Sequence, residues 1–364
     1  MLKSTKIEEL ESIRGLAAIL IFFHHIPKWN PLLNIKIIDK GYLVVDLFFV
    51  LSGFVIYKAY GNKISNTKNL LRFQFLRFAR LYPVHLLFLS VFIFIELAKY
   101  FAEIKLGIHS NSSPFETNNI TALFQQIFLM QAIGPTGKAY TFNIPAWSIS
   151  VEFYTYFIFG LIILFAKKKK NIIFIFLSTV SLFFLITKKT YGFELLLKCI
   201  SGFFIGCLTL TIINRLKFKV PNYSSIIILL LILLFFYLGV NQQYDFLIYF
   251  FTSALIASLI LSKNSYLNNL LNNKILTFLG TISYAIYMSH YSIIWIFHQF
   301  FRVILKKQET IINGQNIPQL SISETLIAWI TITIIVIFIS TMVHRLIERP
   351  LRQNSYRFTL KRFT

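Results

Sequence analysis

Charged side chains are scarce in this 364-residue sequence: Asp, Glu, Lys and Arg make up 14% of it, whereas 56% of the residues are hydrophobic. Soluble globular domains carry about a quarter charged residues and fewer apolar ones. The core of one soluble domain could not cover all 40 Phe side chains, whereas lipid accepts them. The composition therefore excludes an ordinary water-soluble enzyme and indicates an integral membrane protein.

Cysteine and acidic residues are also few. Cys199 and Cys207 lie eight residues apart in one apolar stretch, too far apart on a helix for a disulfide, and no Cys-based metal site is indicated. The seven His residues show no metal-binding spacing either, so we predict no metal site. The net charge of +22 comes from basic residues that punctuate apolar runs, which indicates membrane orientation and no binding of nucleic acid.

The apolar runs predict an all-α, polytopic membrane fold with about ten transmembrane helices. They cover residues 12–27, 42–60, 81–101, 144–166, 171–187, 193–213, 223–240, 244–262, 277–301 and 323–347. Segment 102–143 is the longest predicted loop. With the N-terminus in the cytoplasm, about two-thirds of the 36 Lys and Arg residues lie on the inner side. This bias predicts an inner-membrane protein with both termini in the cytoplasm.

Ionisable groups are costly at membrane depth, so each one inside a predicted span is a candidate for function. In the first span, Arg14 and His25 are eleven residues apart. At about 100° per residue they share one helix face, about 16 Å apart along the axis. An imidazole at this depth could serve as a general base, but an interfacial Arg with a hydrogen-bonded structural His would show the same spacing. His24 points about 100° away and is predicted to be structural.

The second span contains a single carboxylate, Asp46, followed by the small pair Ser52 and Gly53. Antiparallel packing of the first two spans would bring Asp46 to the depth of His25, where it could fix the tautomer of a general base. Alternatively, Asp46 caps a neighbouring helix or binds a Ser hydroxyl.

Two arginines precede the third span on the predicted cytoplasmic side. Arg77 and Arg80, three residues apart, project from one side of a helix and could bind phosphate groups. Binding of anionic lipid headgroups is the alternative, because basic segments beside the membrane commonly bind lipids.

The fourth span opens with Trp147, Ser148 and Glu152, after a proline suited to a helix start. Ser148 and Glu152 lie on one face. Glu152 could orient an acceptor hydroxyl or only complement the helix N-terminus. In the ninth span Ser283, Tyr287 and His290 form one stripe, a pattern that packing polar groups also produce.

Taken together, these motifs resemble the acyltransferase-3 family of membrane O-acyltransferases. The matching features, in chain order, are Arg14 with His25, the segment 41–53 around Asp46, Arg77 to Pro83 with Arg80, Trp147 to Glu152, Ser283 to His290 with Tyr284 and Tyr287, and Ile347 to Pro350. The match runs over residues 8–351. It implies a single transmembrane acyltransferase domain over residues 1–364, in the stand-alone form without a fused esterase-like domain, and residues 352–364 are expected to be a basic cytoplasmic tail.

The resemblance implies transfer of an acyl group, most often acetyl, from cytoplasmic acyl-CoA to a hydroxyl of an extracytoplasmic or lipid-linked glycan. Acyl-CoA is then a co-substrate and no cofactor is bound permanently; the expected partners are acyl-CoA, the glycan acceptor and membrane lipids. The expected catalytic residues are His25, Asp46 and Glu152. Arg14, Arg77 and Arg80 are expected to bind the acyl-CoA. The expected acceptor pocket consists of Trp147, Ser148, Ser52, Tyr284, Tyr287 and His290.

Two other functions are compatible with an aromatic-rich membrane protein. A polysaccharide transporter or flippase without acyl transfer would be expected to show paired repeats and broken helices, which the sequence lacks. A catalytically silent scaffold would give no reason for His25, Asp46 and Glu152 at membrane depth.

Overall fold

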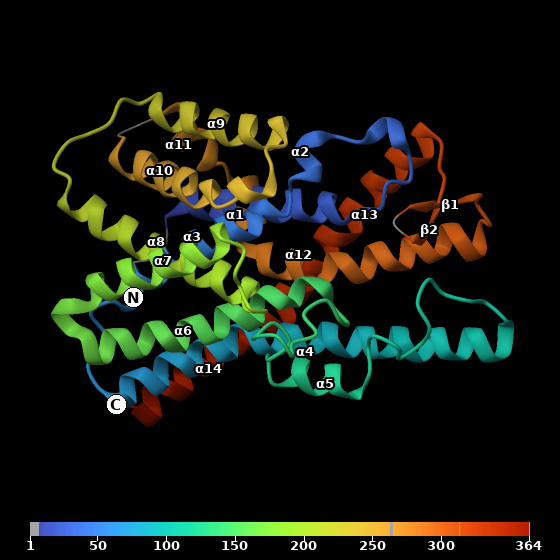
Figure 1. Cartoon of the computed structure of the whole chain (residues 1–364), viewed down its shortest axis with the longest axis horizontal. Coiled ribbons are helices and arrows are strands. Elements are labelled where there is room, and N and C mark those ends of the chain that lie inside the picture. The colour runs from blue at the N-terminus through green and yellow to red at the C-terminus, as the bar shows by residue number, and fades with distance from the viewer. Residues whose placement is uncertain (1–6, 263–264, 313, 364) are drawn as a thin grey trace.

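A computed structural model describes residues 7–262, 265–312 and 314–363, with side chains up to residue 360. These residues are nearly all helical (Figure 1). The α-helices are α1 (Glu8–His25), α2 (Lys36–Asp39), α3 (Leu43–Tyr60), α4 (Thr67–Leu106), α5 (Ile120–Ile127), α6 (Trp147–Ala166), α7 (Lys170–Ile186), α8 (Glu194–Arg215), α9 (Ser224–Leu238), α10 (Leu247–Leu261), α11 (Tyr266–Leu271), α12 (Lys274–Gln299), α13 (Ile322–Val343) and α14 (Arg349–Phe363).

Short irregular turns connect several of these helices. The 3₁₀ turns are Pro31–Leu33, Ile144–Ala146, Lys167–Lys169 and Gln242–Tyr244, and the π turns are Phe300–Ile304 and His344–Glu348. The strands β1 (Glu309–Ile312) and β2 (Gln315–Pro318) pair as an antiparallel hairpin with Glu309 opposite Pro318. This hairpin departs from the expectation of a purely helical chain.

Each of the ten predicted spans coincides with a helix, but several boundaries differ. The span expected at 81–101 is the central part of α4, a continuous 40-residue helix that contains Pro83. Among the described residues, five helical stretches are long and apolar enough to cross a membrane, and α9 and α10 are shorter apolar helices. The structure supports a membrane protein, and the number of crossings and the orientation of the termini remain predictions.

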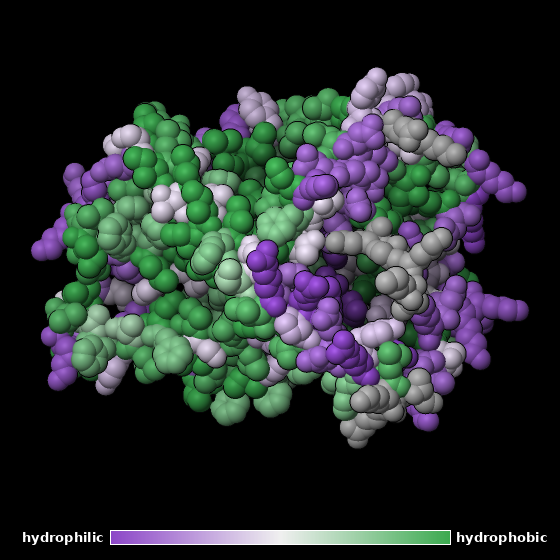
Figure 2. All heavy atoms as spheres, turned by 180° about the vertical axis from the view of Figure 1, so that it is seen from behind, coloured by the Kyte–Doolittle hydropathy of each residue, from purple (hydrophilic) through white to green (hydrophobic). Residues whose placement is uncertain are grey.

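Hydrophobic side chains cover much of the face seen in Figure 2, and hydrophilic ones gather from its middle across its right half, with a few at the left edge. Large apolar side chains such as Phe94, Phe165 and Phe176 are exposed along the helices. A soluble monomer rarely exposes such a surface, whereas lipid would cover it. This surface is consistent with helices that lie in a bilayer.

Close helix contacts hold the interior together. The helix α1 packs on α12, and α3 packs on α8. A Cβ atom at Gly280 would lie 2.0 Å from the carbonyl oxygen of Glu11, and one at Gly53 would lie 1.8 Å from that of Phe203. Small residues allow backbones to approach in this way in membrane helices. Both contacts fix helices that carry the candidate site.

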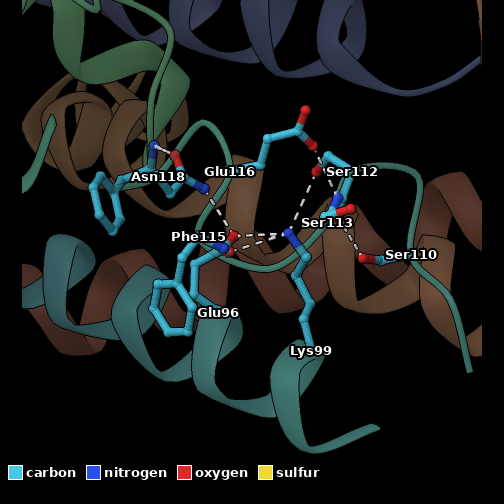
Figure 3. A network of polar contacts seen from close by, with 9 residues as sticks. Glu96, Lys99, Ser110, Ser112, Ser113, Phe115, Glu116 and Asn118 are labelled. Atoms are coloured by element: carbon cyan, nitrogen blue, oxygen red, sulfur yellow. Dashed lines mark hydrogen bonds and ion pairs between the residues drawn. The ribbon is translucent and has the colours of Figure 1, made fainter. Parts of the chain in front are cut away.

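Hydrogen bonds to the buried carboxylate of Glu96 hold the long segment between α4 and α6 in place. Both carboxylate oxygens of Glu96 contact Lys99 Nζ, at 2.9 and 3.2 Å (Figure 3). Glu96 also accepts hydrogen bonds from the Phe115 backbone N–H and the Asn118 amide, each at 2.8 Å. Asn118 Oδ1 in turn accepts from the backbone N–H of Phe142 at 2.5 Å. Glu96 therefore anchors the chain that leads into α6.

The segment 352–364, expected as a tail, falls within α14 as far as Phe363. This helix continues from α13 through the π turn and packs against α4. The expectation did not anticipate this packing, because the segment carries no apolar run.

Candidate active site

Three cavities lie along helices α1, α3 and α4 and contain most of the predicted site residues. The histidine cavity, about 610 Å³, is lined by His25, Asp46, Trp147, Lys198 and Asp245 among others. The glutamate cavity, about 80 Å³, includes Arg14, Arg80, Ser148, Glu152, Tyr284 and Tyr287 in its wall. The arginine cavity, about 460 Å³, is lined by Tyr60, Leu76, Arg77, Arg352, Gln353, Tyr356 and Arg357.

The cavities follow one another along the molecule. Val45 and Tyr287 line both the histidine and the glutamate cavity, so these two are adjacent. On α3, Asp46 lines the histidine cavity and Tyr60 lines the arginine cavity. Fourteen residues of helix separate them, a rise of about 21 Å. The three cavities therefore extend over much of the thickness of a membrane core.

His25 faces the histidine cavity from the last turn of α1 and contacts a second imidazole. Its Nδ1 lies 2.9 Å from the Ile21 carbonyl oxygen and 3.1 Å from Nε2 of His290. Nδ1 of His290 lies 3.0 Å from the carbonyl oxygen of Ile286. His290 is completely buried behind His25.

These contacts assign the hydrogens of both neutral rings. A carbonyl oxygen only accepts, so Nδ1 of each ring carries the hydrogen. Nε2 of His290 is then an acceptor for the Nδ1–H of His25. Among the described residues, Nε2 of His25 has no hydrogen-bond partner, so its lone pair is free, as a general base requires.

Asp46 lies in the same cavity as His25 but has a different partner from the one expected. It is buried, and Oδ1 accepts a hydrogen bond from the Tyr249 hydroxyl at 3.0 Å. Among the described contacts, His290 and not Asp46 is bonded to the His25 ring. Asp46 and His25 are thus brought together by the cavity and not by a direct hydrogen bond.

Glu152 lies at the centre of a small polar cluster. Its Oε1 accepts hydrogen bonds from Ser52 Oγ at 2.6 Å and from the Tyr156 hydroxyl at 2.5 Å. Ser148 donates to the Tyr287 hydroxyl at 2.9 Å, and both hydroxyls reach the carbonyl oxygen of Pro145. The turn at Pro145 starts α6 and so places these groups together. The structure thus places four of the predicted residues in two hydrogen-bonded pairs, Ser52 with Glu152 and Ser148 with Tyr287.

The predicted arginines are divided between two cavities. Arg14 and Arg80 line the glutamate cavity, and Arg77 lines the arginine cavity, where its Nη2 donates to the Tyr60 hydroxyl at 3.3 Å. Arg14 contacts Glu11 at 3.5 Å. Tyr284 lines the glutamate cavity and donates to the Leu81 carbonyl oxygen at 2.5 Å, which ties α12 to α4. Trp147 lines the histidine cavity and packs edge-on against Phe49.

Loop residues form the rim of the histidine cavity. The Tyr42 hydroxyl donates to Asp245 Oδ2 at 2.9 Å and lies 3.1 Å from Lys40 Nζ. Burial raises the pKa of the Asp245 carboxyl above its ordinary value, although this hydrogen bond and the charges of Lys40 and Lys198 oppose the shift. The rim therefore offers several polar groups beside aromatic rings, a composition suited to a hydroxyl-rich ligand.

Sequence reasoning missed three groups in the histidine cavity. Lys198 pairs with Glu194 at 2.9 Å, and Tyr249 binds Asp46. Asp245, the third group, lies in the short connection before α10 and is not among the predicted site residues. A signal for Lys198 was present, because it is the one basic residue between Glu194 and Arg215. Among the described residues, no cluster of three or more His, Cys, Asp or Glu could hold a metal ion.

Comparison with known sequences agrees with the family resemblance of the motifs. The sequence model of the acyltransferase-3 family, described as an acyltransferase domain, matches residues 7–345. This chain belongs to that family. It is therefore an acyltransferase that transfers groups other than aminoacyl groups, and the resemblance read from its motifs is confirmed.

The family assignment is accompanied by a partial match to one curated protein. "Protein 2 in picA locus" of Rhizobium radiobacter is 41% identical over 96 residues, which are 25% of this chain and 44% of that protein. The chain thus spans less than half of that relative's length. No solved structure matches the chain.

Proposed function

We propose that this acyltransferase moves an acyl group, in the simplest case acetyl, from cytoplasmic acyl-CoA to a hydroxyl of an extracytoplasmic or lipid-linked polysaccharide at the inner membrane. The observation that carries the proposal is the free Nε2 of His25 in a cavity that adjoins the Arg14 and Arg80 cavity. The imidazole can take the proton of a hydroxyl acceptor, and the guanidinium groups can bind the phosphates of a thioester donor.

The proposed reaction uses His25 as base and then as acid. Nε2 takes the proton of the acceptor hydroxyl while its oxygen bonds to the thioester carbonyl carbon. The carbon–sulfur bond then breaks, the ester remains on the acceptor, and the CoA sulfur takes the proton from Nε2. Since His25 Nδ1–H points at Nε2 of His290, the imidazolium formed in this step is stabilised by a neutral acceptor.

The donor would enter from the arginine side. Arg77, Arg80 and Arg14 would bind its phosphate groups, for which guanidinium groups are well suited. Arg14 and His25 are about 16 Å apart along α1, a distance that the extended arm of CoA can cover. A thioester held in this way would reach His25 while its nucleotide stays on the cytoplasmic side.

The acceptor would occupy the histidine cavity. Trp147 and Tyr287 offer aromatic faces, and Asp46 and Asp245 offer carboxylates to sugar hydroxyls. Glu152, already bonded to Ser52 and Tyr156, lies next to this space in the glutamate cavity and would orient groups at the reacting centre. Direct transfer and an acyl-His25 intermediate are both compatible with this arrangement.

The test is release of CoA by the purified protein. With acetyl-CoA and a glycan from the host envelope, we expect the wild type to release CoA only when the glycan is present. His25→Ala should abolish this release, whereas His109→Ala, at an exposed loop position, should not. Full turnover by His25→Ala would end the assignment of the base.

Mass analysis of the host glycan distinguishes acyl transfer from transport. Deletion of the gene should remove the mass of one acyl group from the polysaccharide and leave its export unchanged. Loss of export with unchanged acylation of the remaining material would instead identify a transporter.

A further inference from the structure

The arginine cavity has the composition of an anion site. Three arginines, Arg77, Arg352 and Arg357, line it, and no Asp or Glu belongs to its described lining. Two tyrosines, Tyr60 and Tyr356, complete the wall together with Leu76 and Gln353. Guanidinium groups bind phosphates, and aromatic faces stack on nucleobases, so the cavity combines the two features that a nucleotide needs.

Packing on α4 holds the two C-terminal arginines at this cavity. Phe358 of α14 lies against Phe75 of α4, with ring centroids 5.6 Å apart, and Arg72 lies 5.8 Å from the ring centroid of Tyr356. Figure 1 shows α14 alongside α4. The cavity is thus formed by segments that are nearly 280 residues apart in the sequence, which is why sequence motifs did not reveal it.

No carboxylate among the described lining residues balances the positive charge of the three arginines at this cavity. Arg352 experiences repulsion from Arg80 and Arg77, and attraction from Glu348 and Glu11, neither of which lines the cavity. Nε of Arg77 is buried and has no hydrogen-bond partner among the described residues. A bound anion would satisfy this donor and relieve the repulsion.

We propose that the arginine cavity binds the adenosine 3′-phosphate end of the acyl-CoA, with Arg352 and Arg357 on the 3′-phosphate and Tyr60 or Tyr356 against the adenine. This inference rests on the proposed use of acyl-CoA as donor. In CoA the adenosine 3′-phosphate is the part farthest from the thioester, so it belongs in the cavity farthest from His25. The diphosphate would then lie at Arg77 and Arg80, three residues apart on α4.

Neighbouring contacts support one continuous donor path. Tyr156 lines the glutamate cavity and lies within electrostatic range of both Arg77 and Arg80. Arginines therefore continue from the arginine cavity to the glutamate cavity. An anionic lipid headgroup offers the same phosphate chemistry, but it would need no such path toward His25, and this favours the nucleotide.

The experiment measures the affinity of the full-length purified protein for CoA and for dephospho-CoA, which lacks only the 3′-phosphate. We expect the wild type to bind CoA roughly tenfold more tightly, the value of one charge-assisted hydrogen bond. Arg352→Gln and Arg357→Gln should lose most of this preference and bind dephospho-CoA as the wild type does, which also shows that they are folded. Arg345→Gln, an exposed arginine outside the cavity, should keep the preference.

Each outcome separates the inference from the proposed function. If the wild type binds neither ligand, acyl-CoA is not the donor and both proposals fail. If the wild type prefers CoA and both α14 variants keep that preference, the donor stands and the role of α14 is overturned. A lipid headgroup site would give a different result. The Arg352 and Arg357 variants would keep the preference for CoA over dephospho-CoA, but phosphatidylglycerol would no longer raise their unfolding temperature above that in phosphatidylcholine. If the α14 variants lose affinity for CoA and for dephospho-CoA equally, the 3′-phosphate assignment is also overturned.

Discussion

At the scale of single residues, the site depends on the tautomers of His25 and His290, that is, on which ring nitrogen of each carries the hydrogen. His25 alone could present either nitrogen to the cavity. The carbonyl oxygens of Ile21 and Ile286 and the ring of His290 leave Nε2 of His25 as the free one. This makes His290 a positioning residue, in the role that the sequence suggested for Asp46.

Replacement of His290 tests this orientation. In His290→Gln the side-chain oxygen can reach the place of Nε2 and accept from His25, so we expect kcat within roughly tenfold of wild type. His290→Phe fills the same space without an acceptor and should lower kcat by roughly 10²-fold, with the KM for acetyl-CoA unchanged. Initial rates of CoA release measure both values. Equal rates for the two variants would show that His290 only fills space.

The residue types at the site were predictable, but their partners were not. A His, an Asp and a Glu inside apolar runs stand out in any reading of the sequence. However, His25 and His290 are 265 residues apart, and Asp46 and Tyr249 are 203 apart. Nothing local indicates which of several intramembrane polar groups meet, because that depends on how the helices pack.

At the scale of elements, the long helix α4 supports both ends of the site. Arg77 and Arg80 lie in its first half, and Glu96 near its far end anchors the loop that leads to α6. The sequence predicted a helix here because the apolar run is clear. It underestimated the length because helical structure continues into polar turns, and Pro83 within the run did not end it.

Loss of the Glu96 carboxylate should loosen this loop. Glu96→Ala leaves the Lys99 ammonium buried without a counter-charge, with only 7% of its side chain exposed. We expect a cost of about 3–5 kcal/mol, seen as a lower unfolding midpoint in detergent. The double variant Glu96→Ala with Lys99→Met should recover part of the loss, because it removes the unpaired charge.

A partly exposed carboxylate on the same helix, Glu103, is the matched control. Glu103 contacts His109 at 3.1 Å in a largely exposed pair, so Glu103→Ala should change stability by less than about 1 kcal/mol. If the Glu96 and Glu103 variants unfold at the same temperature, the buried network does not hold the loop.

The hairpin β1–β2 shows where pattern reading fails at this scale. Its strands have four residues each, too short for a period-two signal to stand out from loop sequence. The helices α9 and α10, by contrast, were predicted well because their apolar runs are bounded by polar turns.

At the scale of the whole molecule, the histidine and arginine cavities lie toward opposite ends of α3. Loop residues 241–243 line the histidine cavity, and α14 lines the arginine cavity. The charge bias of the sequence predicts that the α14 side faces the cytoplasm. Hydrophobic runs predicted where the long apolar helices lie, whereas the short helices and the cavities between helices were not predictable from such runs.

Labelling with a membrane-impermeant maleimide tests this orientation. Cys199 and Cys207 are buried, so the wild type should give little background. Gln243→Cys, at the rim of the histidine cavity, should react in intact spheroplasts, and Gln353→Cys, in the arginine cavity, only after the membrane is permeabilised. The reverse pattern would invert the topology and with it the direction of acyl transfer.

The π turn His344–Glu348 joins α13 to α14 without a break in the helical path. Its buried ends, His344 and Glu348, are bonded to each other at 2.9 Å. A helix advances about 100° per residue, so a deletion of one residue here would swing the guanidinium groups of Arg352 and Arg357 about a quarter turn away from α4. The number of residues in this turn thus decides whether Arg352 and Arg357 of α14 face the cavity or the surrounding water. Insertions and deletions at this turn should therefore be tolerated far less than substitutions.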